Sequence, residues 1–108
     1  MRPQGNVRIQ KFDANGGFLT TWGSRGSGDG QFMGVQAVAT DGAGHVYATD
    51  SVNRIQKFDA NGTFIAKWGS FGTANGQFSG PSGVAVDAAG HVYVADQNNS
   101  RIQKFACP

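Results

Sequence analysis

The sequence has few of the features that mark a disulfide-bonded, membrane-spanning or exported protein. Its 108 residues include one cysteine, Cys107, so no disulfide can form within the chain. We interpret this residue as a terminal thiol without a role. No apolar run approaches the roughly 18 residues of a membrane-spanning helix, and residues 1–6 lack the apolar stretch of a signal peptide. We therefore expect no membrane partner and, for the chain as written, a cytoplasmic location.

Charge is also scarce, whereas glycine is abundant. Charged residues make up 15% of the chain and the net charge is +2. Lys and Arg are spread along the sequence instead of forming a block, so this surplus does not by itself require nucleic acid. No segment has the apolar spacing of a helix. Seventeen glycines, with scattered β-branched and aromatic residues, predict many short strands joined by tight turns.

One nine-residue string organises the chain. RIQKFDANG at residues 8–16 recurs unchanged at 54–62, and its first five residues return at 101–105. The copies start about 46 and then 47 residues apart, a period in the range of propeller blades. We divide this single domain into a first unit at 7–53, a second unit at 54–100 and a partial repeat at 101–108.

Each full unit contains four short apolar segments separated by turns rich in Gly or Asn-Gly. Connections this short predict an antiparallel four-stranded meander. The nine expected strands are 7–12, 18–22, 37–41, 45–50, 54–58, 64–68, 83–87, 91–96 and 101–105. Residues 84–86 and 92–95 are apolar on both faces, which is typical of strands buried on both sides. Stacked sheets around an axis supply such burial, and this favours a propeller over a sandwich.

The repeat resembles a known family. Residues 78–96, continued through 101–105, resemble the NHL repeat, and residues 59–77 resemble the outer hairpin and connecting loop of that repeat. The first unit departs modestly, with Val35 where Pro81 stands in the second. NHL repeats form β-propellers, most often six-bladed. The resemblance therefore implies an all-β fold of four-stranded antiparallel blades, with two blade-equivalents in this chain.

Two blades cannot close a ring, because propellers have typically 4–8 blades. An open pair exposes apolar faces and unpaired edges, so we expect a homo-oligomer. Three chains, the favoured number, would make six blades, and two or four chains would make four or eight. One blade would combine residues 83–105 with 18–22 of the next chain. Segments 7–12 and 101–105 then compete for one position, and the sequence does not say which is displaced.

Two histidines and four aspartates are candidates for chemistry. His45 and His91 follow turn glycines at matching places, and repeated His around an axis could bind a metal, but no Cys or carboxylate stands at short ligand spacing. The aspartates end strands, where carboxylates could serve acid–base catalysis or accept turn amides. They are Asp41, Asp50, Asp87 and Asp96. We favour the structural interpretation for all six and expect Asp50 to pair with Arg54, and Asp96 with Arg101.

Two further features give only weak support for a ligand-binding function. The glycine-rich segments 23–30 and 69–76 lack Gly-Lys-Ser/Thr and open no helix, so we interpret them as connections between blades and not as phosphate cradles. Basic residues repeat along the chain, and some animal NHL propellers bind RNA through a basic face. These are Arg8, Arg25, Arg54, Arg101, Lys11, Lys57 and Lys67. The Phe and Trp residues lie within strands, however, so nucleic acid is disfavoured.

The leading hypothesis is a non-enzymatic, self-assembling module that serves as a scaffold or binds a protein or small ligand, without a cofactor. The alternatives are a propeller lyase or hydrolase with an axial metal, and an RNA-binding propeller. Partners would meet the loops around the axis. The residues of these loops are Gly34, Val35, Gln36, Ser51, Val52, Asn53, Ser79, Gly80, Pro81, Ser82, Gln97, Asn98, Asn99 and Ser100.

Overall fold

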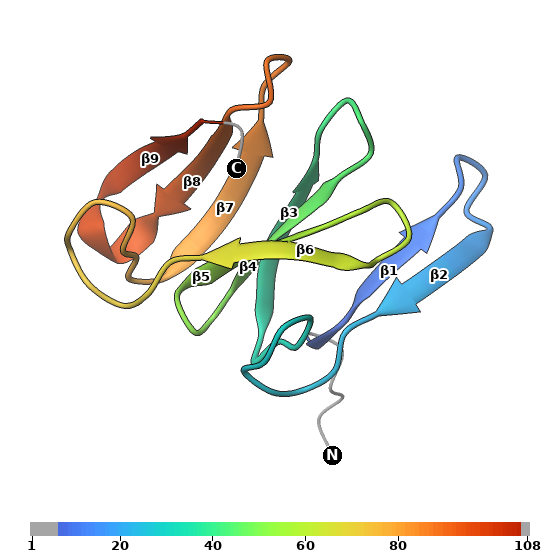
Figure 1. Ribbon diagram of the computed structural model, residues 1–108, viewed down its shortest axis with the longest axis horizontal. Helices are drawn as coiled ribbons and strands as arrows, with labels where there is room; N and C mark the ends of the chain where they lie inside the picture. Colours follow the sequence, from blue (N-terminus) through green and yellow to red (C-terminus); the bar gives the residue numbers. More distant parts are fainter. Residues whose placement is uncertain (1–6, 107–108) are drawn as a thin grey trace.

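The computed structural model describes residues 7–106, so Cys107 and residues 1–6 lie outside the described residues (Figure 1). The chain is all-β and its strands pair antiparallel, as predicted. The strands are β1 (Ile9–Phe12), β2 (Phe18–Trp22), β3 (Val35–Thr40), β4 (Val46–Asp50), β5 (Arg54–Phe58), β6 (Phe64–Trp68), β7 (Pro81–Val86), β8 (Val92–Asp96) and β9 (Arg101–Phe105). A single 3₁₀ turn, η2 (Gln97–Asn99), links β8 to β9.

The strands form three separate sheets. The middle sheet has the order β3-β4-β5-β6, the first sheet contains β1 and β2, and the third sheet has the order β7-β8-β9. The first and third sheets flank the middle one, and together they make a flattened fan of 40 × 39 × 21 Å (Figure 1). The predicted four-stranded antiparallel meander is found in the middle sheet, which takes two strands from each of the units 7–53 and 54–100.

Some predicted strand boundaries were wrong. The strands expected at 37–41 and 83–87 begin two residues earlier, because Val35 and Pro81 pair with the last residues of β4 and β8 across a bulge. The strands expected to start at His45 and His91 start one residue later, since both histidines still belong to the preceding turn. The first strand begins at Ile9 instead of residue 7.

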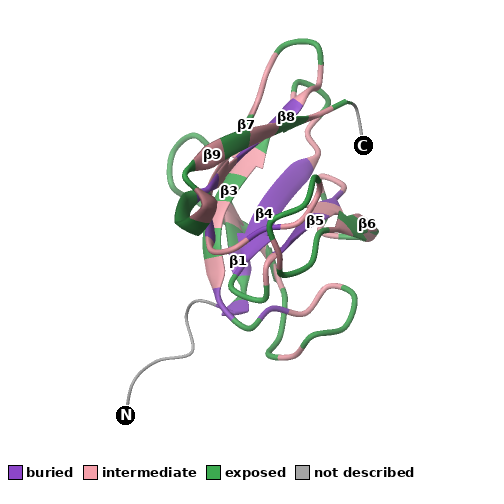
Figure 2. Ribbon diagram, turned by 90° about the vertical axis from the view of Figure 1, so that its left-hand side faces the viewer, coloured by how far each residue is buried: buried purple, intermediate pink, exposed green. Residues whose placement is uncertain are grey.

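The middle sheet is covered on both faces. On one face Val46, Ala48 and Phe58 pack with Val7 and Ile9 of the first sheet region. On the other face the side chains of β4 and β5 meet the third sheet, in a cluster of Tyr47, Ile55, Phe78, Val92 and Val94. Every residue of β4 is therefore buried (Figure 2). Because strand side chains alternate between faces, one strand supplies both hydrophobic layers.

The third sheet is covered on one face only. The expectation that residues 84–86 are buried on both sides was wrong, because Ala85 is exposed and Val84 and Val86 are only half-buried. Within the described part of the chain, no sheet lies over the outer face of β7–β9. Apolar composition alone therefore did not predict the burial of β7, because no sheet within residues 7–106 covers its outer face.

The glycine-rich segments connect one sheet to the next, as predicted. Two residues after each segment stands a phenylalanine, Phe32 or Phe78, whose ring is fully buried between two sheets. Gly69 has φ +106°, and a Cβ at this position would lie 2.6 Å from the Phe78 ring. Only glycine adopts this backbone conformation without strain while leaving room for the ring. The connection and the core are therefore built together.

Candidate interaction site at the ends of the second strands

A buried carboxylate stands at the end of β4. Asp50 accepts hydrogen bonds from the backbone N–H groups of Met33 (3.1 Å) and Gly34 (3.0 Å). Arg54 at the start of β5 donates to the same carboxylate, with 3.4 Å between Nη2 and Oδ2. Asp50 therefore joins the incoming connection, β4 and β5, and the predicted Asp50–Arg54 pair is confirmed.

Asp96 repeats this arrangement at the end of β8. It accepts from the Ser79 amide (2.7 Å), from Asn99 Nδ2 (2.9 Å) and from Arg101 Nε (2.8 Å). Burial by itself would raise the pKa of Asp96. These hydrogen bonds and the charge of Arg101 lower the pKa by more than burial raises it, so it lies below its usual value. The predicted pair with Arg101 is confirmed, and both members serve the structure of the loops.

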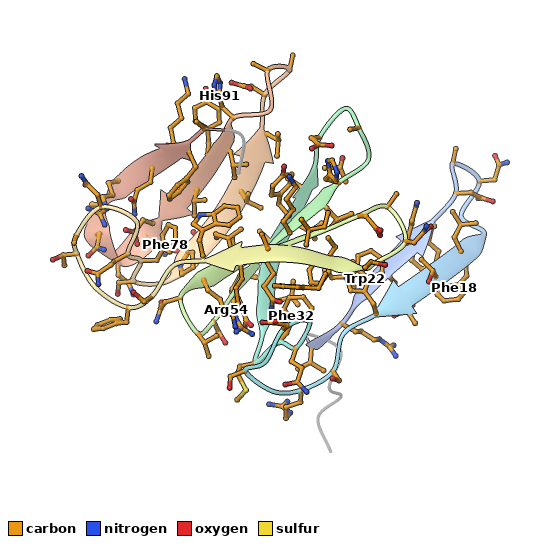
Figure 3. The ribbon with its side chains drawn as sticks, viewed as in Figure 1. Phe18, Trp22, Phe32, Arg54, Phe78 and His91 are labelled. Carbon is orange, nitrogen blue, oxygen red and sulfur yellow. The ribbon has the colours of Figure 1, made fainter. Side chains whose placement is uncertain are left out.

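The arginines also hold the glycine-rich connections. Arg54, which is labelled in Figure 3, donates to the carbonyl oxygens of Ser27 and Gln31, each at 2.6 Å. Two residues along the strand, Gln56 donates to Gln31 O (2.6 Å) and accepts from Gly30 N (2.8 Å). We call this pair of side chains on one strand the Arg–Gln clamp.

The third sheet contains the same clamp. Arg101 donates to Thr73 O, Ala74 O and Gln77 O, at 2.8, 3.0 and 2.9 Å. Gln103 donates to Gln77 O (2.6 Å) and accepts from Gly76 N (2.9 Å). The sequence reasoning missed the glutamines. Their spacing of two residues from Arg in every copy of the string places both side chains on one face of the strand, and this signal could have found them.

Several of the predicted loop residues meet around one cavity. Its volume is about 250 Å³, and its lining is Gln36, Ser51, Gly80, Pro81, Ser82, Gln97 and Asn98. Half of the predicted interaction residues therefore come together, although they belong to two different sheets. The remainder support the cavity or lie away from it.

Hydrogen bonds between the loops hold this cavity. Asn53, in the left-handed conformation with φ 65°, accepts from Gly80 N through its side-chain oxygen at 2.9 Å, and this bond joins the middle and third sheets. Asn98 bonds Ser79 twice, from its backbone N to Ser79 O (2.9 Å) and from Nδ2 to Ser79 Oγ (3.3 Å). Gly80 has φ +71°, a conformation that glycine adopts without strain, and a Cβ there would lie 2.9 Å from Asn98 Nδ2.

The other predicted residues have structural positions. Gly34 is buried against Asp50, Val35 packs on the first hydrophobic layer, and Asn99 bonds both Asp96 and Gly72 O. Val52 is exposed in the link before β5, and Ser100 is exposed with φ 52° at the end of η2. None of these five lines the cavity.

Comparison with known protein families gives a match that covers the third sheet. The NHL repeat family model matches residues 78–105, which contain β7, β8 and β9 together with the buried Phe78. The chain carries an NHL repeat. The resemblance stated from the sequence is thereby confirmed for this segment, and an NHL repeat is typical of propeller modules that bind proteins. No curated protein matches the chain.

The NHL repeat and its counterpart in the first unit both contain an Asp–His–Tyr network at the turn between their first two strands. Asp41 accepts from Ala43 N and His45 N, both at 2.9 Å, and from His45 Nδ1 (2.8 Å) and Tyr47 Oη (3.2 Å). Burial by itself would raise the pKa of Asp41. The hydrogen bonds and the charge of His45 lower the pKa by more than burial raises it, so it lies below its usual value. The predicted role of this aspartate in accepting turn amides is confirmed.

Asp87 has the same partners in the NHL repeat. The backbone N–H of His91 is the main reason that its pKa falls to about 2, and hydrogen bonds from Tyr93 and the His91 ring add to this shift. His45 and His91 thus each bond their own aspartate. Within residues 7–106 no group of three His, Cys, Asp or Glu side chains could hold a metal ion.

The cavity beside the NHL repeat is neutral. Its lining consists of amide and hydroxyl side chains, one proline and one glycine, without a charged residue. Such groups donate and accept hydrogen bonds but cannot compensate a ligand charge. The cavity is therefore suited to an uncharged polar group such as a peptide backbone. No helix among the described residues is long and apolar enough to cross a membrane.

Proposed function

We propose that this chain is a non-enzymatic protein-interaction module whose sheets are blades of an NHL propeller, completed by copies of the same chain. Support comes from the NHL repeat at 78–105 and from the four-stranded meander of the middle sheet, which has the strand order of a propeller blade. The proposal involves neither a cofactor nor nucleic acid.

One comparison within the chain carries this proposal. Ile55 and Ile102 occupy the same place in the string RIQKF, yet Ile55 is fully buried and Ile102 is 71% exposed. The middle sheet buries Ile55 against the third sheet, whereas the corresponding face of the third sheet has no cover in residues 7–106. An apolar sheet face of this kind marks an interaction surface.

Strand number supports a head-to-tail arrangement. The chain contains one complete four-stranded sheet, a two-stranded sheet and a three-stranded sheet. Joining the first sheet of one copy to the third sheet of the next makes two blades for every chain, with one strand in excess. Equivalent head-to-tail contacts close into a ring when the rotation allows it, and three chains would give six blades.

In this ring the loops around the cavity would form the surface that meets other proteins. Gln36, Ser82 and Asn98 stand on this surface from two neighbouring sheets, and they offer amides and hydroxyls without charge. We propose that this surface binds an uncharged backbone segment of a partner. Titration with a panel of short uncharged peptides should shift the side-chain amide resonances of Gln36 and Asn98, whereas shifts confined to distant surfaces contradict this assignment.

The assembly is tested by the mass of the 108-residue chain in solution. Light scattering across a micromolar concentration series should give about three times the chain mass of 11.3 kDa, with dissociation on dilution. A second copy covers the exposed face of the third sheet, so Ala85 of β7 should lose solvent contact only in the assembled form. A stable species of 11.3 kDa throughout the series would contradict the proposal.

A further inference from the structure

The same five residues, RIQKF, occur at β1, β5 and β9, although β1 itself begins at Ile9, after the arginine. The polar side chains form hydrogen bonds in only two of these copies. The Arg–Gln clamps of β5 and β9 each hold a glycine-rich connection and a buried aspartate. In the first copy the corresponding residues are Arg8, just before β1, and Gln10 in β1; both are exposed, and among residues 7–106 neither side chain makes a hydrogen bond. In the first copy, Arg8 and Gln10 therefore form a clamp that holds neither a glycine-rich connection nor an aspartate within the described residues.

The inner edge of β1 is also open. In the middle sheet β5 pairs with β4, whereas within the described chain β1 pairs only with β2. A cavity of about 370 Å³ lies along this edge between the first and middle sheets, and its lining includes Gln10, Lys11, Phe12, Val38, Thr40 and Val46. Val38 is 50% exposed in it. In the middle sheet, β4 and β3 lie beside β5. The cavity takes the corresponding position beside β1.

The strand that corresponds to β4 is β8. Both follow the pattern His-Val-Tyr with an aspartate at the end, at residues 45–50 and 91–96. Asp96 at the end of β8 is the counterpart of Asp50, which receives the clamp of β5. The edge of β8 is therefore a binding site for a clamp strand, and in the isolated chain β9 occupies it.

We propose that β9 is a placeholder strand: on assembly, the β1–β2 hairpin of a second copy displaces β9 from the edge of β8. Arg8 of that copy then bonds Asp96, and Gln10 bonds Gln77. The inference rests on the proposed self-assembly, and it specifies which of the two competing copies of RIQKF leaves its position.

The core of the first sheet explains why β1 stays and β9 leaves. Val7, the residue before Arg8, is 8% exposed and packs in the first hydrophobic layer, whereas Ser100 stands at the corresponding place before Arg101. Removing β1 would expose Val7 and Ile9, and β9 would bring a serine in place of the valine. In β9, Ile102 already faces solvent, and the one aromatic residue that packs inward, Phe105, has its counterpart in Phe12 of the incoming strand.

The hairpin also brings a complete outer half of a blade. β1 is bonded to β2, and Thr21 Oγ1 additionally donates to Ile9 O at 2.9 Å. β9 has no strand on its outer edge within the described residues. Exchange therefore replaces one strand by two and turns the three-stranded third sheet into a four-stranded one. Backbone pairing to β8 is preserved, because the two strands have the same sequence.

An aromatic contact is conserved in the exchange. Trp68 packs on Phe105 of β9, with 5.7 Å between ring centroids, and Trp22 packs on Phe58 of β5 at the same separation. Phe12 is the counterpart of both phenylalanines and is 51% exposed. In the exchanged form Phe12 of the second copy replaces Phe105 against Trp68. The added burial at this contact and in the cavity beside β1 favours the assembled form.

Matched clamp variants of the 108-residue chain test the exchange by sedimentation equilibrium. Arg8→Ala/Gln10→Ala removes the incoming clamp and should raise the dissociation constant of the assembly at least about 10-fold. Arg101→Ala/Gln103→Ala weakens the placeholder alone and should lower that constant at least about 10-fold. Equal effects of the two variants, or weakening by the second variant alone, overturn the exchange while self-assembly stands. If the unmodified chain does not associate at all, the proposed function fails as well.

Cross-linking provides a second test that does not depend on the stability of β9. In β8–β9 Tyr93 pairs with Lys104, so exchange should pair Tyr93 with Lys11 of a second copy. In a Cys107→Ser background, mass-tagged Tyr93→Cys and Lys11→Cys chains are mixed and oxidised, and a heterodimer is expected. The matched control is Lys57→Cys in place of Lys11→Cys, because Lys57 already pairs with Tyr47 within its own sheet. Absence of the Lys11→Cys product, or an equal yield from the control, overturns the proposal.

Discussion

Asp50 and Arg54 face each other across the link between β4 and β5, with 3.4 Å between Arg54 Nη2 and Asp50 Oδ2 and with both side chains buried. Both side chains also form hydrogen bonds with the backbone of the connection before β3. A charge pair that would be costly to bury alone is thus compensated by amide and carbonyl groups. The Asp50–Arg54 pair thereby keeps the glycine-rich connection before β3 in one conformation.

Asp50→Ala should therefore destabilise the chain strongly. It leaves the Arg54 guanidinium buried without its carboxylate and removes the acceptor of two backbone amides, so we expect a loss of about 3–5 kcal/mol in the free energy of unfolding. Urea denaturation followed by tryptophan fluorescence measures this loss. Asp29→Ala is the matched control, because Asp29 pairs with Lys67 at 2.8 Å on the exposed surface and should cost at most about 1 kcal/mol. Similar losses for the two variants would contradict this role of Asp50.

Gly69→Ala should disturb the connection into the third sheet. The substitution puts a Cβ 2.6 Å from the buried Phe78 ring at a φ of +106°, and we expect a loss of at least about 2 kcal/mol in unfolding free energy. Gly42→Ala serves as the control, since nothing lies within 4 Å of a Cβ there. Its effect should stay within about 0.5 kcal/mol. Comparable urea midpoints for these two variants would show that Gly69 is not constrained.

Phe58→Ala should remove the centre of the first hydrophobic layer. Phe58 is fully buried and its ring packs on Trp22, Phe32 and Phe64. Truncation leaves a cavity, with an expected cost of about 3–5 kcal/mol. Phe71→Ala, at a ring that is largely exposed, should change the stability by no more than about 0.5 kcal/mol. Thermal and urea unfolding of the two variants at one protein concentration decide between these expectations.

Acid should weaken the fold through the aspartates that accept turn amides. The pKa of Asp87 in the folded chain is about 2, below the usual value of about 3.9. The folded form thus binds fewer protons, so the stabilisation is present above about pH 4 and is lost as the pH falls towards about 2. Asp41, Asp59 and Asp96 have pKa values shifted in the same direction.

Urea midpoints between pH 6 and pH 2 test this linkage. The midpoint should fall with pH in the unmodified chain, and Asp87→Asn should be less stable at neutral pH but lose less between pH 4 and pH 2. A midpoint that does not change below pH 4 would contradict the lowered pKa values. An unaltered slope in Asp87→Asn would instead assign the acid sensitivity to the other carboxylates.

The amino-acid sequence was sufficient to predict nine strands, their antiparallel pairing and a four-stranded meander. These properties depend on local patterns: alternation within a strand, Asn-Gly and Gly turns, and connections too short for crossovers. The Asp–Arg pairs were predictable for the same reason, since both partners lie on either side of one short link. The bulges that extend β3 and β7 to Val35 and Pro81 depend on pairing across the sheet, and local patterns do not reveal them.

Burial and the site were decided only by the tertiary structure. Residues IQKF of the string lie in a strand in all three copies, yet the isoleucine is 7% exposed in β1, fully buried in β5 and 71% exposed in β9. The difference arises because burial of a strand face depends on which sheet lies against it, and that sheet comes from a distant part of the chain. The cavity at Ser51 and Gly80 likewise forms from links that are separate in sequence, and it is held by the bond from Gly80 N to Asn53. Repetition in the sequence determined what each sheet can pair with, and the packing of sheets decided which of those surfaces remain open.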